Sequence, residues 1–251
     1  MSSAVERFRR TRLFQRVRRT ESLVGRMVLL RLAGAAHYLR RGHLVRRREV
    51  SEYLSRTDAP RLQIGSGQKP LEGWLDSDLI AGDIYLDLER RLPLPDSSFQ
   101  YVFSEHVIEH LTQQAGAALL GEIHRILRPG GVVRLTTPDL KKILALYEDR
   151  NPVIALAEYS RFLDGETGGK PHQLRSQVLN DMMRHWGHRY VYDEEDLATK
   201  LTEAGFEQVE RVEPGESRHP QLRGAEQRPK WQNQAEAMSL EAIKPLSLRR
   251  P

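Results

Sequence analysis

Residues 95–138 read PDSSFQYVFSEHVIEHLTQQAGAALLGEIHRILRPGGVVRLTTP, and this stretch decides the fold. The turn-forming run PDSS leads into the apolar segment Phe99–Phe103, which predicts a strand. Apolar residues over 119–127 recur at three- and four-residue spacing, which is typical of a helix. Pro-Gly-Gly at 129–131 predicts the end of that helix, and the β-branched run Val132–Thr136 predicts a second strand. A strand, a helix and a strand in this order indicate a parallel pair within an α/β sheet.

Further strand and helix signals lie on both sides of this unit. Asp193 is placed as the N-cap of a helix that Gly205 ends. Residues 140–192 have a mostly helical pattern with a glycine-rich break at 165–169, and residues 214–236 are predicted to be a long loop. The alternation predicts an α/β fold with a mostly parallel sheet and flanking helices. The other predicted strands are Arg61–Ile64, Trp74–Leu79, Asp83–Leu88, Phe206–Val212 and Met238–Ile243.

The composition is that of a globular protein. The chain has 251 residues, of which 39% are hydrophobic and 29% charged, enough to bury a core. It contains no cysteine. A disulfide scaffold, a thiolate metal site and a cysteine nucleophile are therefore excluded.

The charge divides the chain in two. Residues 1–57 contain 15 arginines and four acidic residues, a net charge of +11, so residues 58–251 carry −6 of the total of +5. We predict a basic helical extension over 1–57, followed by one α/β domain over 58–251. The high overall isoelectric point then describes the extension and not the body.

The extension also bears on location. Its most apolar part, residues 23–39, is shorter than a membrane-spanning helix and is interrupted by Arg26 and Arg31. The same arginines argue against a secretory signal. We expect a cytoplasmic protein whose basic extension packs on the body or on a partner, or contacts the inner membrane surface. The sequence leaves the oligomeric state open.

Small and acidic residues follow the first three predicted strands. A Gly-Ser-Gly turn at 65–67 follows the first, Asp78 closes the second, and Asp87 closes the third. Glycines permit a tight turn close to a ligand, and a strand-end acid can accept the hydroxyls of a ribose. Ligands of such sheets bind beyond the carboxyl ends of the strands. Pro70 stands where a dinucleotide fingerprint needs its third glycine, so that reading is not supported.

Seven motifs carry a family resemblance: RLQIGSG (61–67), EGWLDSDL (72–79), DIYLDL (83–88), LPLPDSSFQYVFSEHVIEHL (92–111), EIHRILRPGGVVRLTTPDL (122–140), WGHRYVYDEEDLATKLTEAGFEQV (186–209) and MSLEAIKP (238–245). Together they resemble class I S-adenosylmethionine-dependent methyltransferases of the methyltransferase type 11 kind. The similarity is to a bacterial subgroup often linked to cell-surface polysaccharide genes, and it covers residues 60–245. It implies a Rossmann-like sheet of seven strands whose last strand runs antiparallel.

The resemblance implies S-adenosylmethionine as the cofactor. The glycine turn would lie under its methionine part, Asp78 would bind the ribose, and Asp87 and Leu88 would contact the adenine. The implied cofactor contacts are, in chain order, Gly65, Ser66, Gly67, Asp78, Asp87, Leu88 and Ser104.

Two residues after the fourth predicted strand are catalytic candidates. The resemblance places Glu105 and His106 beside the transferable methyl. Base catalysis needs a group that titrates near neutral pH and reaches the nucleophile, which favours His106, with Glu105 second. The family shares no single catalytic residue, so this assignment is made from location.

One feature departs from the family pattern. Gly67 and Trp74 are seven positions apart, too close for the helical crossover that normally joins parallel strands. The helix whose N-terminus would help to hold the cofactor carboxylate is therefore predicted to be absent. Lys69 is a candidate to replace it electrostatically.

The run from His106 to His110 matches the inverted zinc-protease pattern H-x-x-E-H. That pattern requires a helix and a further glutamate ligand, whereas here it follows a strand directly. We predict no metal site, and the alternative is that Glu109 and His110 form hydrogen bonds near the cofactor pocket. His188 either faces the substrate cleft or anchors its loop.

The predicted function is methyl transfer from S-adenosylmethionine to a small-molecule or glycan acceptor, at oxygen or nitrogen. One alternative is a non-catalytic scaffold, which the shortened glycine-turn region favours. A second is a nucleic-acid methyltransferase guided by the basic extension. The body has no basic patch interleaved with aromatic residues, and TTPDL at 136–140 lacks the aromatic residue of a base-flipping motif. Nucleic acid is therefore not the favoured partner.

Overall fold

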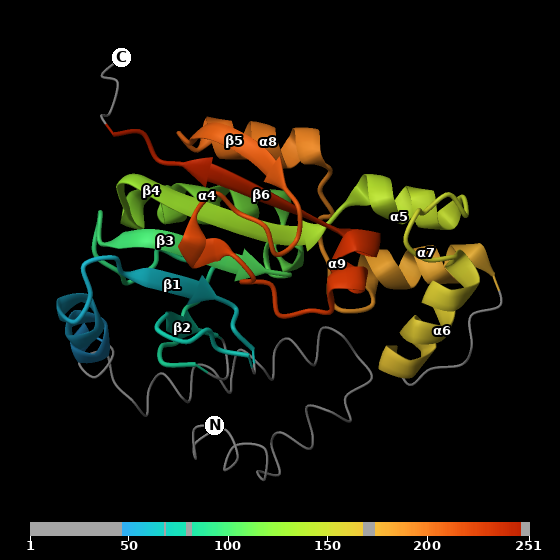
Figure 1. The fold of residues 1–251 in the computed structure, drawn as a ribbon, viewed down its shortest axis with the longest axis horizontal. Coiled ribbons are helices and arrows are strands. Elements are labelled where there is room, and N and C mark those ends of the chain that lie inside the picture. Colours follow the sequence, from blue (N-terminus) through green and yellow to red (C-terminus); the bar gives the residue numbers. More distant parts are fainter. Residues whose placement is uncertain (1–46, 68, 79–81, 168–173, 247–251) are drawn as a thin grey trace, which may run out of the picture.

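The computed structural model describes residues 47–67, 69–78, 82–167 and 174–246. Within these ranges, six strands form one sheet in the order β2-β1-β3-β4-β6-β5 (Figure 1). The strands are β1 (Arg61–Ile64), β2 (Leu75–Ser77), β3 (Phe99–Glu105), β4 (Leu127–Pro138), β5 (Glu207–Val212) and β6 (Ala237–Ile243). Strands β2, β1, β3 and β4 run parallel, whereas β6 lies antiparallel between β4 and β5. The mostly parallel sheet and its antiparallel last strand are confirmed.

The prediction of seven strands is wrong for the described part of the chain. Predicted strand Asp83–Leu88 forms one isolated parallel bridge, between Ile84 and Ser77 of β2. Ile84 is still buried, but the chain turns soon afterwards, where Glu89 N donates to Asp87 Oδ1 (3.1 Å). The alternation of apolar residues there reflects burial at the edge of the sheet and not a full ladder.

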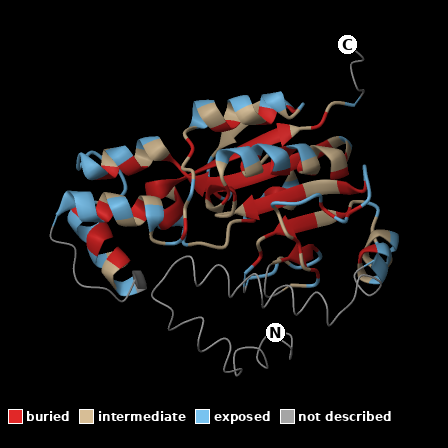
Figure 2. Cartoon of the chain, turned by 180° about the vertical axis from the view of Figure 1, so that it is seen from behind, coloured by how far each residue is buried: buried red, intermediate tan, exposed pale blue. Residues whose placement is uncertain are grey.

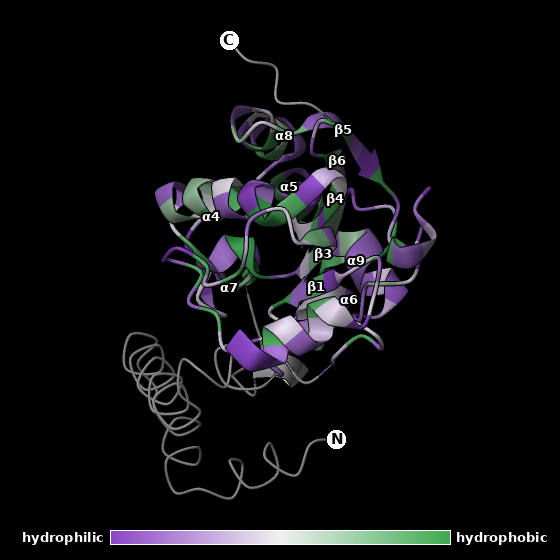
Figure 3. Cartoon of the chain, turned by 90° about the vertical axis from the view of Figure 1, so that its left-hand side faces the viewer, coloured by the Kyte–Doolittle hydropathy of each residue, from purple (hydrophilic) through white to green (hydrophobic). Residues whose placement is uncertain are grey.

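Helices flank the sheet. Helices α4 and α8 pack on it and against each other, on the same side in Figure 3. Burial is concentrated in the strands, while the helices expose their outer faces (Figure 2). The helices are α4 (Gln113–Ile126), α5 (Leu140–Tyr147), α6 (Leu156–Thr167), α7 (Arg175–Arg184), α8 (Glu194–Glu203) and α9 (Lys230–Glu236), with 3₁₀ turns η1 (Ile108–His110) and η2 (Pro220–Leu222).

Helices α5, α6 and α7 lie beyond the carboxyl ends of β1, β3 and β4 (Figure 1). They share a second core, separate from the one under the sheet. Its buried residues are Ile143, Leu146, Leu156, Tyr159, Leu163, Val178 and Met182. The helical pattern predicted over 140–192 is therefore confirmed in its described part. The glycine-rich break predicted at 165–169 is wrong in its described part, because residues 165–167 belong to α6, and residues 168 and 169 lie outside the described residues.

The predicted loop over 214–236 is partly wrong, because it contains η2 and α9. The side chain of Arg134 on β4 is fully buried and anchors this segment. Its guanidinium donates to Glu216 O (2.6 Å) and Glu241 Oε1 (2.7 Å) and forms an ion pair with Glu226. The segment is therefore packed on the sheet and not free in solvent.

Residues 47–55 are helical and pack on the body. Val50 is buried in the main core. The Tyr53 hydroxyl accepts from Arg61 N (2.9 Å) at the start of β1. The rest of the predicted extension, residues 1–46, lies outside the described residues. Among the described helices, none is long and apolar enough to cross a membrane.

Candidate active site

The carboxyl ends of β1, β2 and β3 meet at one edge of the sheet, and the glycine turn is held there. The backbone N–H groups of Gly65 and Ser66 both donate to Ser77 O, at 2.8 and 3.0 Å. Gly67 N donates to Asp78 Oδ2 (3.1 Å). These bonds bring the turn after β1 and the acid after β2 together, as the sequence predicts.

The two glycines serve different purposes. Gly65 has φ +71° and touches the segment after β3, where an added Cβ would lie 2.3 Å from Val107 Cγ2. Gly67 has φ +56°, and an added Cβ would meet nothing within 4 Å. The first glycine allows close packing, while the second leaves open space of the kind a ligand needs.

A second acid beside the turn was missed by sequence reasoning. Asp76 lies within β2, is buried, and accepts from Ser66 Oγ (3.1 Å). Burial and the neighbouring Asp83 raise the pKa of Asp76 to about 7. An aspartate inside a short apolar strand is the signal that could have revealed it.

The predicted adenine contacts have structural roles at the edge of the sheet. Asp87 caps the turn at Glu89 and also pairs with Arg90 Nε (3.3 Å). Leu88 is partly buried against the main core. Their contact with a cofactor stays a prediction.

The end of β3 carries the other predicted residues. Ser104 is buried in β3 opposite Ile64 of β1. The Glu105 carboxylate accepts from Gln227 N (2.8 Å), Arg228 N (3.3 Å) and Asn233 Nδ2 (3.2 Å). Glu105 thus holds the chain before α9, and these contacts compete with its predicted proton-transfer role.

His106 follows β3 in a left-handed conformation, with φ +53°, and its N–H donates to Thr136 O (2.8 Å). Its imidazole is 6% exposed, and Nδ1 lies 3.1 Å from Glu109 Oε1. Within the described structure, Nε2 has no hydrogen-bond partner. This ring nitrogen is the basic atom that the site leaves available.

Glu109 fixes this imidazole. Its carboxylate is fully buried, and Thr137 Oγ1 donates to Oε2 (2.9 Å). Burial alone would raise the pKa of Glu109, but the hydrogen bond from His106 and the nearby imidazoles lower it to about 2. Because an ionised carboxylate only accepts hydrogen bonds, the proton of a neutral His106 ring lies on Nδ1 and the lone pair on Nε2.

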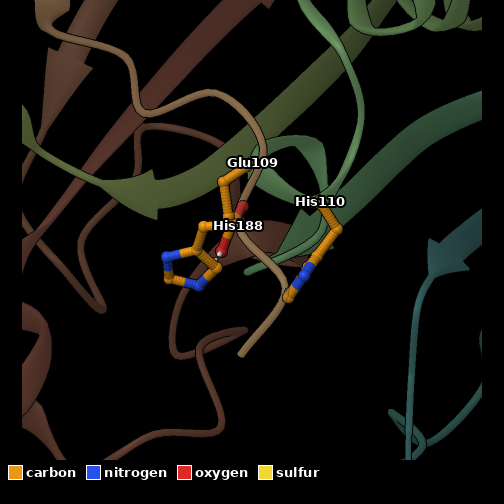
Figure 4. Close-up of side chains that lie close together, drawn as sticks. All are labelled: Glu109, His110 and His188. Carbon is orange, nitrogen blue, oxygen red and sulfur yellow. Dashed lines mark ion pairs between the residues drawn. The ribbon is translucent and has the colours of Figure 1, made fainter. Parts of the chain in front are cut away.

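His188 joins the same cluster from the segment after α7 (Figure 4). Its Nε2 lies 4.0 Å from Glu109 Oε1, and Nδ1 lies 2.8 Å from Met182 O. Burial lowers the pKa of His188 to about 4. The backbone also docks here, because Arg189 N donates to Glu109 O (2.7 Å). The segment is therefore anchored on Glu109, which sequence reasoning named as one of two alternatives.

The cluster bears on the metal question. Glu109, His110 and His188 each offer one donor atom, and these atoms lie within 4.8 Å of one another. The zinc-protease pattern requires a helix, but His106 precedes the short 3₁₀ turn η1 and does not belong to a helix. A metal here would compete with His106 for Glu109 Oε1.

No helix follows the glycine turn in the described residues between β1 and β2, as predicted. The candidate replacement cation is engaged elsewhere, because Lys69 Nζ donates to Gln227 O (2.7 Å). This bond ties the turn to the segment before α9 and leaves the proposed role of Lys69 toward the cofactor untested.

Part of the chain, including the residues at this edge of the sheet, is similar to known proteins. Residues 62–135 match the family model described as Methyltransferase domain. The matched residues include the glycine turn, the strand-end acids and the exit of β3. A 48-residue stretch is also 50% identical to a probable S-adenosylmethionine-dependent methyltransferase of Mycolicibacterium smegmatis, covering 19% of this chain and 18% of that protein. These matches support the predicted class, an S-adenosylmethionine-dependent methyltransferase.

Solved structures give weaker similarity. A phosphoethanolamine N-methyltransferase of Haemonchus contortus aligns at a TM-score of 0.44 and 14% identity, over 78% of this chain and 51% of that one. A possible histamine N-methyltransferase of Thermotoga maritima aligns at a TM-score of 0.43 and 16% identity, over 92% and 98%. The chain spans about half the length of the first of these and less than a fifth of the mycobacterial relative. Similarity at this level does not bear on the acceptor.

Proposed function

We propose that this protein transfers a methyl group from S-adenosylmethionine to a small-molecule or glycan acceptor. The observation that carries the proposal is the family match over residues 62–135, which contains the groups that meet at the carboxyl edge of the sheet.

The site has the kinds of group that S-adenosylmethionine needs. The open space over Gly67 gives room beside the turn, and Asp78 lies at the adjacent strand end. A carboxylate at that position is the usual partner of ribose hydroxyls in such sheets. The cofactor supplies an electrophilic methyl group, and the protein's task is to align the acceptor with it and to take up a proton.

His106 is the proposed general base. It follows β3 at the same edge, and its Nε2 is unpartnered in the described structure. Glu105 is the weaker candidate because three donors already occupy its carboxylate. Ser104, Asp87 and Leu88 complete the proposed cofactor contacts.

Asp78→Asn tests the proposal. The amide keeps the shape of the side chain but loses the charged acceptor for two ribose hydroxyls, so S-adenosylmethionine binding should weaken by about 1.5–3 kcal/mol, or roughly 10- to 150-fold in Kd. Isothermal titration calorimetry on the full chain measures this, with Asp96→Asn as a control at an exposed acid. Unchanged affinity removes Asp78 from the ribose site.

The scaffold alternative rests on the missing helix after the glycine turn. It predicts that the unaltered protein binds no S-adenosylmethionine in the same titration. The nucleic-acid alternative predicts binding that falls steeply with salt. We place the protein in the cytoplasm, with its basic N-terminal residues as the part that would contact the inner membrane surface.

A further inference from the structure

A pocket lies beside His106, between the carboxyl edge of the sheet and the helices α5–α7. In the free chain it has room for about one water molecule, about 10 Å³. Its lining includes His106, Tyr159 on α6, Met182 on α7 and Glu236 at the end of α9. Binding of a small molecule here therefore requires side chains of the lining to move.

Two buried polar atoms in its lining residues lack a partner. Five buried side-chain atoms in the described residues have no hydrogen bond, and two of them are His106 Nε2 and the Tyr159 hydroxyl. Tyr159 is fully buried. Because buried polar groups are nearly always hydrogen-bonded, two unpartnered atoms around one pocket indicate a polar group from outside the chain that satisfies them.

We infer that this pocket is the methyl-acceptor site and that it takes a hydroxyl group, of a sugar or a phenol, which contacts Tyr159 and gives its proton to His106. The inference rests on the proposed methyl transfer and narrows its acceptor. The acceptor must displace side chains at the pocket mouth, where Trp186 is 39% exposed, because both orphan atoms are shielded from solvent.

The pocket adjoins the proposed cofactor site. Val107, the next residue after His106, is the side chain that an added Cβ on Gly65 would strike. The glycine turn and the base are thus separated by one side chain.

The chemistry balances with the groups present. The acceptor oxygen forms a bond to the methyl carbon while the C–S bond breaks, and its electron pair returns to sulfur as a neutral thioether. The hydroxyl proton moves to His106 Nε2 and then to solvent. Glu109 is the positioning residue, because its ionised carboxylate keeps the other ring proton on Nδ1.

The charge of the pocket favours a hydroxyl over an ammonium. Burial and the charge of Glu109 raise the pKa of Glu236 to about 8, and the carboxyl also accepts from Gln232 Nε2 (2.9 Å). Arg228, which lines the same pocket, lies with Nη1 3.4 Å from Glu236 Oε1 and engages this acid. The described pocket therefore offers no free anion to attract an amine, while Ile143, Met182 and Trp186 offer apolar walls to a ring.

Tyr159→Phe is the sharpest test. Its hydroxyl has no partner in the free protein, so removing it should leave the melting temperature unchanged or slightly raised. If the hydroxyl binds the acceptor, KM for that acceptor should rise about tenfold with little change in S-adenosylmethionine affinity. Tyr147→Phe, at a half-exposed tyrosine of α5, is the matched control. An unchanged acceptor KM overturns the assignment of Tyr159.

His106→Gln and Glu109→Gln test the base and its positioning residue. Both should keep S-adenosylmethionine affinity, while kcat falls about 10²–10⁴-fold for His106→Gln and less for Glu109→Gln, with acceptor KM nearly constant. His124→Gln, at a histidine of α4 packed on Phe206, is the control. If Glu109→Gln fails to fold, the kcat of His106→Gln alone tests whether this histidine is the base. Full turnover in His106→Gln overturns the inference.

The assay uses methyl glycosides of hexoses and catechol as probes, with labelled S-adenosylmethionine as donor. Transfer to one class identifies the source of the hydroxyl. Binding of S-adenosylmethionine without transfer to either class overturns the inference but keeps the proposed function, whereas no binding removes the proposed function itself. Treatment with EDTA should leave turnover unchanged. If EDTA abolishes turnover and added zinc restores it, the cluster of Glu109, His110 and His188 binds a metal, and the role of His106 is overturned.

Discussion

At the scale of the residue, the site depends on one close approach. Gly65 lies against Val107, and Val107 belongs to the turn that presents His106 and Glu109. A side chain at position 65 would therefore act on two segments that are 42 positions apart in the chain. The positive φ adds a second reason for glycine there, because an L-residue with φ +71° is strained.

Gly65→Ala should lower the free energy of unfolding by at least about 2 kcal/mol, through the clash and the strained backbone. Gly67→Ala is the matched control, since it has a similar φ but open space around it, and should cost about 1 kcal/mol. Urea denaturation measures both. Adding Val107→Ala to Gly65→Ala should recover part of the loss. Equal effects at the two glycines would contradict this account.

Asp76 makes stability depend on pH. The pKa of this acid is raised to about 7 in the folded chain, so between about pH 4 and 7 the folded state binds more protons than the unfolded state. The contribution of Asp76 to the free energy of unfolding should therefore fall as pH rises through this window. Asp76→Asn should remove this contribution from the pH dependence, and Asp96→Asn should not. The same pH dependence in the Asp76 variant and the unaltered protein would contradict the assignment.

At the scale of the element, the sequence predicted the turns and helix ends that depend on neighbouring residues. The turn before β3, the Asp193 cap of α8 and its end at Gly205 are all found. Where β4 begins was not predicted, since α4 ends at Ile126 and the Pro-Gly-Gly turn lies inside β4.

Long-range partners explain what was missed. The segment 214–236 is ordered by Arg134, whose bond to Glu226 joins positions 92 apart. The pocket is likewise formed by distant segments, because His106 follows β3 and Tyr159 belongs to α6. No pattern within either segment shows such contacts. The groups at the strand ends were therefore predictable from the sequence, whereas the pocket beside His106 was not.

Arg134→Met tests the anchor of that segment. It leaves Glu226 and Glu241 buried without their cation, which typically costs about 3–5 kcal/mol of unfolding free energy. Arg150→Met, at an exposed ion pair with Glu148, should change it by less than about 0.5 kcal/mol. Thermal and urea unfolding compare the two. If Arg134→Met changes the free energy of unfolding as little as Arg150→Met does, the segment is held by its apolar contacts.

At the scale of the whole molecule, the boundary suggested by charge and the boundary of the core do not coincide. Basic residues continue to Arg56, which places the change in charge near position 57. The core nevertheless includes Val50, with Tyr53 and Leu54 packed against it. Charge distribution describes the surface, whereas a folding unit is set by burial. The predicted division at 57 and 58 therefore needs a direct test.

Two truncated chains separate the alternatives. A chain of residues 47–251 keeps the helix at 47–55, whereas a chain of residues 58–251 removes Val50 and exposes the core beneath it. Burying one such side chain contributes about 1.5–3 kcal/mol, so the shorter chain should be less stable by at least about 3 kcal/mol once Tyr53 and Leu54 are included. The longer chain should still bind S-adenosylmethionine, because the glycine turn and Asp78 are untouched. In that chain, Tyr53→Phe removes the hydrogen bonds of this hydroxyl to Arg61 and to Gly73 O (3.0 Å) and separates them from apolar burial. Equal stability of the two chains, measured by urea unfolding, would restore the boundary at 57, since the helix would then contribute nothing to the fold that carries the site.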